Sequence, residues 1–260
     1  MDIASMFCVR DKRVLIQSPE HPYAEAVLDG FLEAGAQVFV CGEDRAALIR
    51  AAERPCGKIM GAIHYAPTRE EDAQALALEI EKAAGGLDAF IHASPPPMLK
   101  GWDHTFDAIY AALTRSQLHL MLTVKHIGAL LAKGAAGSLL FLTDYAALVG
   151  CDRENSHGDA RLLEEDFSLD YGFVKGSYVN YARQAAGYLG LHNVRCNAIA
   201  YAPLPKSRDR EFEEAFIRHS HLKRAIHARD IQSAALFLSS DAASYITGVT
   251  LPVDGGYTAK

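Results

Sequence analysis

Two side chains in the second half of the chain have types and a spacing suited to proton transfer. Tyr171 and Lys175 are four residues apart in a segment whose apolar pattern predicts a helix over residues 171–191. Residues at positions i and i+4 lie on the same face of a helix, so such a helix would bring the two side chains together. Tyrosine and lysine both act as general acids and bases, although such a pair is also common without any function. The pair is a candidate catalytic site.

A carboxylate ends the apolar run SLLFLT, which predicts a strand in the core. Asp144 follows this run, directly after Thr143. Ligands of parallel sheets bind outside the carboxyl ends of the strands, which places Asp144 where it can face one. Successive strand residues point to opposite faces, so we expect the hydroxyl of Thr143 to point away.

The stretch LIQSPEHPYAEAV, residues 15–27, joins the first predicted strand to the first predicted helix and contains no glycine. Pro22 suits the first position of a helix, and Glu25 suits the positive end of its dipole. A helix start attracts anions through its N–H groups, but proline has no N–H and Glu20 adds negative charge. The stretch therefore indicates a well-formed helix start that is poorly suited to phosphate.

Short apolar strands alternate with amphipathic helices along the chain, among them RVLIQ, QVFVCG, GAIHYA and DAFIHA. This alternation is typical of βαβ units and a parallel sheet with helices on both faces. We expect an α/β fold, a Rossmann-like doubly wound sheet of about seven strands, in a single domain over residues 1–260. A long helical pattern over residues 102–133 precedes the strand that ends at Asp144.

Composition excludes several classes of function. The formal net charge is −6 with acidic and basic residues interspersed, so we expect no nucleic-acid partner and no membrane association. The five cysteines are scattered, and the first residues lack the apolar run of a signal peptide, which predicts a cytoplasmic protein. The histidines show no metal-ligand spacing, so we expect no metal site.

Two segments resemble the short-chain dehydrogenase/reductase family: ARDIQSAALFLSSDAASYITGVTLPVDGGY at the end of the chain and NVRCNAIAYAP before it. The similarity extends over nearly the whole chain. It implies that Tyr171 and Lys175 form the Y-x-x-x-K pair of that family. The tyrosine would then exchange a proton with the substrate oxygen, and the lysine would lower the pKa of the tyrosine and hold the nicotinamide ribose.

The chain departs from the family pattern at its other motifs. The three glycine positions of the cofactor loop hold Ser18, Pro22 and Ala24, and the serine that polarises the substrate carbonyl is replaced by Asp144. An extra charged segment within residues 151–170 lengthens the interval before Tyr171. We therefore expect no bound NAD or NADP, and Tyr171 and Lys175 become possible remnants.

These departures favour a non-catalytic subunit that assembles with an active paralogue in a heterotetramer, or else forms a homo-oligomer. Within this class, the chain resembles the inactive subunit of a two-component acyl-CoA dehydrogenase of this family, as in hydroxybenzylsuccinyl-CoA oxidation. One alternative is an NAD(P)-dependent oxidoreductase that uses Tyr171 and Lys175 with an altered cofactor loop. Another is a cofactor-independent lyase similar to halohydrin dehalogenases, which keep a serine and an arginine where this chain has Asp144 and Lys175.

Overall fold

The computed structural model describes residues 2–93, 95, 98–150, 167–205 and 210–259. Its centre is a seven-stranded sheet in the order β3-β2-β1-β4-β5-β6-β7, and every strand pair is parallel. The strands are β1 (Arg13–Gln17), β2 (Gln37–Gly42), β3 (Lys58–His64), β4 (Ala89–Ala93), β5 (Gly137–Asp144), β6 (Val194–Tyr201) and β7 (Thr250–Val253). The predicted single-domain, Rossmann-like α/β fold is confirmed.

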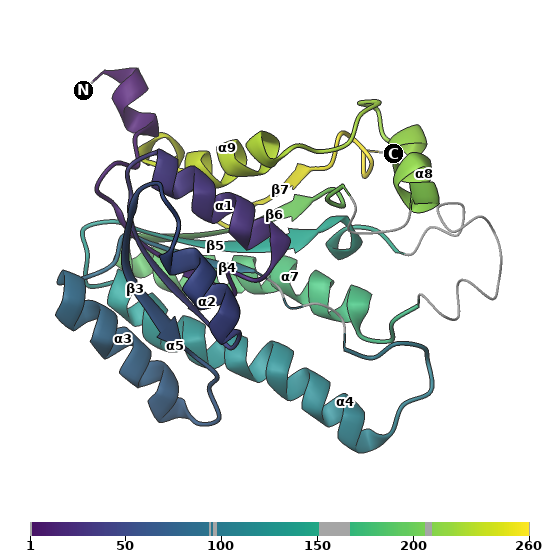
Figure 1. The fold of residues 1–260 in the computed structure, drawn as a ribbon, viewed down its shortest axis with the longest axis horizontal. Helices are drawn as coiled ribbons and strands as arrows, with labels where there is room; N and C mark the ends of the chain where they lie inside the picture. The colour runs from purple at the N-terminus through teal and green to yellow at the C-terminus, as the bar shows by residue number, and fades with distance from the viewer. Residues whose placement is uncertain (1, 94, 96–97, 151–166, 206–209, 260) are drawn as a thin grey trace.

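Helices cover both faces of this sheet (Figure 1). One face carries α1 (Pro22–Glu33), α2 (Arg45–Ala52) and α9 (Ala228–Ser239), and the other carries α3 (Glu70–Ala84), α5 (His119–Leu131) and α7 (Tyr171–Leu189). The remaining elements are α4 (Phe106–Leu113), α8 (Arg210–His219), a π-helical segment η2 (Thr114–Leu118), and the short helices η1 (Ile3–Phe7), η3 (Tyr145–Ala147), η5 (Gly190–His192) and η6 (Asp241–Ala243). The central strands are buried on both sides, which explains their continuous apolar runs.

The strand order reverses between β1 and β4, and this creates the crevice in which doubly wound folds bind ligands. Local sequence fixes the elements around it. Pro22 occupies the first position of α1, and the imidazole of His21 caps that helix by accepting the N–H of Tyr23. The predicted helix over residues 102–133 begins at Phe106, because Thr105 caps the N–H of Ala108 there.

None of the described helices combines the length and the apolar character needed to cross a bilayer.

Candidate active site

The start of α7 brings Tyr171 and Lys175 to the carboxyl edge of the sheet. The carboxylate of Asp170, which precedes the helix, accepts the backbone N–H groups of Met98 and Leu99 at 3.0 and 3.2 Å. These bonds fasten the beginning of α7 to the segment that follows β4. The Lys175 ammonium is buried and donates to the carbonyl oxygen of Pro95 at 3.1 Å.

Asp144, the last residue of β5, joins this pair. Its Oδ2 accepts the hydroxyl of Tyr171 at 2.8 Å and lies 3.5 Å from Nζ of Lys175. Its Oδ1 accepts the N–H of Ala146 at 3.0 Å, which fixes the orientation of the carboxylate. The structure thus brings together the three candidate catalytic residues that the sequence analysis named.

Burial dominates the electrostatics of this cluster, since only 3% of the Lys175 side chain and 8% of the Asp144 side chain are exposed. Burial, and then the negative charge of Asp144, raise the pKa of Tyr171 well above its usual value. Burial also lowers the pKa of Lys175, against the opposing effect of the Asp144 charge. The family resemblance implied a lowered pKa for the tyrosine, and burial, together with the carboxylate in place of a serine, reverses that expectation.

Thr143 does not substitute for the absent serine. Its side chain is fully buried, and its hydroxyl donates to the backbone carbonyl of Lys175 at 3.3 Å. The alternation of side chains along β5 accounts for this, as expected.

A cavity of about 300 Å³ opens at the carboxyl ends of β1, β2 and β4. Ser18 and Pro22 line this cavity instead of filling it, while Ala24 lies on the buried face of α1 and packs into the core. Ser18 has a φ of 61°, a left-handed conformation of the kind that glycine usually adopts, so the backbone still turns where a glycine would turn it. The volume lies within the range of small-molecule sites.

His92 closes the inner side of this cavity, at the end of β4. Its Nδ1 lies 2.9 Å from Oε1 of Gln17 and its Nε2 lies 2.9 Å from the hydroxyl of Tyr178. Burial lowers the pKa of His92 to about 3, so the ring is neutral. Because an amide oxygen only accepts, Nδ1 carries the proton and Nε2 accepts from Tyr178. These hydrogen bonds, from Gln17 through His92 to Tyr178, fix the position of α7 relative to the cavity.

Three further cavity residues carry polar or charged groups that the sequence analysis missed as site residues. The ring of His21 is neutral because burial lowers its pKa to about 3. Its Nδ1 accepts the N–H of Tyr23, so its proton is on Nε2, which is a hydrogen-bond donor. Glu43 follows β2 and forms an ion pair of 2.6 Å with Arg115 from η2. The position of Glu43 after the second strand could have predicted from the sequence that it is a site residue, because acidic residues there bind the ribose of dinucleotides.

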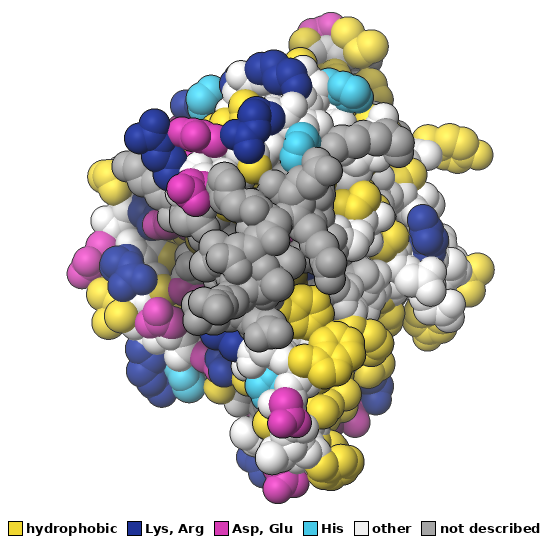
Figure 2. Space-filling view, turned by 90° about the vertical axis from the view of Figure 1, so that its right-hand side faces the viewer, with side chains coloured by type: hydrophobic (Ala, Val, Ile, Leu, Met, Phe, Trp, Pro, Cys, Tyr) yellow, Lys and Arg dark blue, Asp and Glu magenta, His cyan; other side chains and the backbone are white. Residues whose placement is uncertain are grey.

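The carboxyl edge of the sheet also carries exposed apolar groups. Figure 2 faces this edge and shows apolar side chains gathered below and to the right of the centre of the view. Trp102 before α4, Phe106 and Tyr110 on α4, and Phe173 on α7 are each more than half exposed. Bridges between Lys100, Gly101 and Ser168 hold the segment before α4 against the start of α7. The extra charged segment within residues 151–170 lies mostly outside the described residues.

The described residues contain no group of three or more His, Cys, Asp or Glu side chains suited to a metal ion.

Comparison with known proteins gives the family. Residues 23–258 match the family model described as enoyl-(acyl carrier protein) reductase. The chain belongs to the short-chain dehydrogenase/reductase family. It is 28% identical to glucose 1-dehydrogenase of Gluconobacter oxydans over 95% of this chain and 92% of that protein. It is 27% identical to galactitol 2-dehydrogenase (L-tagatose-forming) of Cereibacter sphaeroides over 88% of this chain and 87% of that protein.

The fold is shared with solved members of the family. The structure of a 7α-hydroxysteroid dehydrogenase in complex with NADH and 7-oxo glycochenodeoxycholic acid superposes with a TM-score of 0.82. It covers 98% of either chain at 21% sequence identity. A short-chain dehydrogenase/reductase from Mycobacterium marinum gives a TM-score of 0.84 at 20% identity, with all of both chains covered.

Two expectations from the sequence are corrected by these findings. The non-catalytic subunit is contradicted, because the relatives that match nearly the whole chain are named as dehydrogenases, which favours the oxidoreductase alternative. The expected absence of a cofactor is contradicted by membership of this family and by relatives that are named dehydrogenases. The physical reason is visible at Ser18 and Pro22, which line an open cavity where we expected them to fill it.

Proposed function

We propose that this chain is an NAD-dependent oxidoreductase that interconverts an alcohol and a carbonyl compound. The observation that carries the proposal is the convergence of Tyr171, Lys175 and Asp144 at the carboxyl edge of the sheet, beside the cavity at the ends of β1, β2 and β4. Both features lie at the crevice in which folds of this kind bind dinucleotides. The names of the relatives support the same class of reaction.

The cavity offers groups that suit a dinucleotide despite the altered loop. The Nε2–H of His21 is a donor beside the start of α1, where glycine-rich loops would present backbone N–H groups. Glu43 lies after β2, in the position from which a carboxylate accepts the hydroxyls of a ribose. The nicotinamide ring, when bound, supplies or accepts the hydride.

The acidic side of the cavity favours NAD over NADP. Burial raises the pKa of Glu20, and the charges of Asp44 and Glu43 raise it further against the opposing charge of Arg115. Arg115 is already paired with Glu43, so its charge is largely compensated. A ribose 2′-phosphate would add negative charge to this wall, whereas a free 2′-hydroxyl would donate to it.

Tyr171 is the group that meets the substrate oxygen in this proposal. Its hydroxyl is the proton carrier, and Lys175 and Asp144 hold it in place from within the protein. The exposed rings of Trp102, Phe106 and Phe173 flank the same edge, so we propose an alcohol with a sizeable apolar part. The hydroxyacyl-CoA of the sequence analysis stays one member of this class to be tested.

The test is a panel of secondary alcohols, sugars, steroids and a hydroxyacyl-CoA thioester, assayed with NAD and NADP by the absorbance of the reduced cofactor. Binding of each cofactor is measured separately by calorimetry. We expect saturable NAD binding and turnover of at least one apolar alcohol. A protein that binds neither cofactor and oxidises no alcohol would contradict the proposal.

We also propose that two copies of this chain pair through α5 and α7. The groove between these helices has a volume of about 560 Å³, with small side chains such as Ala129 and Ala185 and the larger Met121 and Tyr188 on the same surface. Tyr188 is 68% exposed, so it can enter the groove of a second copy while its counterpart enters the first.

Mass measurement in solution tests this pairing. The wild type should be a dimer or a higher oligomer, and Tyr188→Glu should shift it toward the monomer because a charge in an apolar interface is costly. A monomeric wild type would refute the pairing. A co-purifying dehydrogenase-like chain would replace the second copy by the paralogue that the sequence analysis considered.

A further inference from the structure

Resting on the proposed function, we infer that Asp144 receives the proton of Tyr171 while Tyr171 receives the proton of the substrate hydroxyl. The chain would then act as an alcohol dehydrogenase, with NAD as the acceptor of the hydride. The direct observation is the bond of 2.8 Å from the Tyr171 hydroxyl to Oδ2 of Asp144. In that bond the phenol donates, because an ionised carboxylate can only accept.

Asp144 cannot do what a serine does at this position. A serine hydroxyl donates to the substrate oxygen, whereas a carboxylate has no proton to donate and would repel a negative oxygen. Asp144 instead directs its Oδ2 at Tyr171, and the N–H of Ala146 holds its Oδ1. Asp144 is therefore a positioning residue and proton acceptor behind Tyr171, and only Tyr171 meets the substrate.

The surrounding charges favour a relay that keeps Tyr171 neutral. Burial and the charge of Asp144 raise the pKa of Tyr171, so a free phenolate is a poor resting base. Lys175 cannot compensate fully because Asp144, 3.5 Å away, already balances its charge. If both protons move together, Tyr171 never becomes a phenolate and its high pKa is no obstacle.

In this relay, each bond that breaks is matched by a bond that forms. The O–H bond of the substrate breaks and its proton binds Oη of Tyr171, while the Tyr171 proton moves to Oδ2 of Asp144. The hydride leaves the substrate carbon for the oxidised nicotinamide cofactor, and the substrate becomes a carbonyl compound. Asp144 ends as a neutral acid, so the charge that would repel the substrate oxygen disappears in the same step.

Several titratable groups face this cluster. Tyr23 from α1 and Tyr145 from η3 both lie close enough to Tyr171 to contribute to its raised pKa. Burial raises the pKa of Tyr23 well above its usual value, so Tyr23 stays neutral at neutral pH. His21 and His92 face Lys175 and are neutral, because burial lowers the pKa of both to about 3. Asp170 adds a second negative charge near Lys175. Among these groups, Asp144 is the one whose charge the relay changes, and Lys175 is the cation 3.5 Å from it.

The first test measures how the hydrogen bond to Asp144 affects the titration of Tyr171, and it needs no enzymatic turnover. Tyrosinate absorbance is titrated in the wild type and in Asp144→Asn, with Tyr171→Phe in both backgrounds to isolate Tyr171. Asparagine keeps the size and an acceptor oxygen but removes the charge, so the Tyr171 pKa should fall by about 1–3 pH units. An unchanged Tyr171 titration would overturn the inference.

The second test reads the relay through the pH dependence of alcohol oxidation. Asp144→Asn should lower kcat near neutral pH by about 10²–10⁴-fold, and the remaining rate should rise with pH as Tyr171 ionises. Asp144→Glu, which can accept a proton, should recover part of the neutral-pH rate. The matched control is Asp241→Asn, at the opposite edge of the sheet, which should keep the wild-type rate and profile.

The outcomes separate the relay from the proposed function. A wild type that oxidises an alcohol while Asp144→Asn keeps its kcat and pH profile would refute the relay and leave the oxidoreductase intact. A wild type without turnover would refute the oxidoreductase, and the tyrosinate titration would still test the contact. If Asp144→Asn does not fold by circular dichroism, Asp144→Ala, which removes the acceptor oxygen as well as the charge, is titrated in its place: a Tyr171 pKa and a pH profile both equal to wild type would then refute the relay.

Discussion

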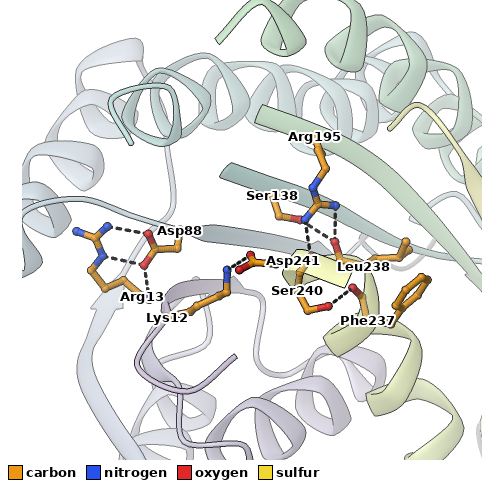
Figure 3. Close-up of polar contacts among 9 residues, drawn as sticks. All are labelled: Lys12, Arg13, Asp88, Ser138, Arg195, Phe237, Leu238, Ser240 and Asp241. Atoms are coloured by element: carbon orange, nitrogen blue, oxygen red, sulfur yellow. Dashed lines mark hydrogen bonds and ion pairs between the residues drawn. The ribbon is translucent and has the colours of Figure 1, made fainter. Parts of the chain in front are cut away.

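The two edges of the same sheet use charged side chains in opposite ways. At the amino edge, Arg13 forms a bidentate pair with Asp88, with bonds of 2.9 and 2.7 Å, and about a quarter of each side chain is exposed (Figure 3). At the carboxyl edge, Lys175 and Asp144 are almost fully buried and 3.5 Å apart. The first pair has short contacts and is partly exposed to solvent, whereas the second has a longer contact and is buried.

This difference separates stability from chemistry. Arg13 meets Asp88 with a matched fork of donors, so both charges are satisfied and neither is available for a reaction. Asp144 shares one oxygen between Tyr171 and Lys175, and burial shifts the pKa values of both partners. Perturbed groups of this kind cluster at functional sites, because burial makes proton positions sensitive to small changes.

The largest effect is expected for Tyr171→Phe. The change removes only the hydroxyl, so kcat should fall by about 10²–10⁴-fold while NAD binding and thermal unfolding stay close to wild type. Tyr188→Phe, on the exposed side of the same helix, is the matched control and should keep full activity. Equal rates for the two variants would show that the carboxyl edge is not the reaction site.

At the amino edge, Arg13→Ala should lower the free energy of unfolding by about 2 kcal/mol and leave kcat unchanged, because Asp88 loses a charged partner at a partly buried position. Chemical denaturation measures the first effect and the alcohol assay the second. A loss of kcat without a loss of stability would show that this pair at the amino edge serves catalysis and not stability.

The same variant has a predictable pH dependence. Burial would raise the pKa of Asp88, but the hydrogen bonds and charge of Arg13 outweigh burial and lower it. The pair therefore stabilises the fold fully above the ordinary aspartate pKa of about 4 and loses this effect as the pH falls through the lowered value. The difference in unfolding free energy between wild type and Arg13→Ala should shrink below about pH 4.

The strands were predictable from sequence because buried strands are composed mostly of apolar residues. Runs such as AFIHA in β4 are fully buried, and a continuous apolar run predicts a strand of a covered parallel sheet. Tyr171 and Lys175 were found from their spacing together with the family resemblance, since a helix fixes the relation of i to i+4.

The carboxyl edge was only partly predictable because its contacts join distant segments. Whether Ser18 fills or lines the cavity depends on its backbone, and its φ of 61° cannot be read from a serine in a sequence. The pair of Glu43 with Arg115 brings η2 against the end of β2, which no local pattern indicates. The inference from residue types that the ligand was lost together with the loop glycines was therefore wrong.

A smaller effect is expected for Glu43→Ala. The change removes one acidic group from the cavity and leaves Arg115 without that partner, so the ratio of the NADP and NAD dissociation constants should fall about tenfold, or about 1.4 kcal/mol. Glu53→Ala, at an exposed position just after α2, is the matched control and should leave the ratio unchanged. An unchanged ratio in Glu43→Ala would place the ribose elsewhere.

The smallest effect is expected for Asp241→Asn, which breaks the ion pair with Lys12. The N···O distance in this pair is 2.7 Å, the same as between Arg13 and Asp88, but 57% of the Asp241 side chain is exposed. Water screens an exposed pair and a single ammonium contact orders two mobile side chains, so the loss of unfolding free energy should be below about 1 kcal/mol and should vanish in high salt. Denaturation of this variant beside Arg13→Ala compares two contacts of equal length. If the two losses are equal, distance and not burial or fork geometry sets the strength of the amino edge.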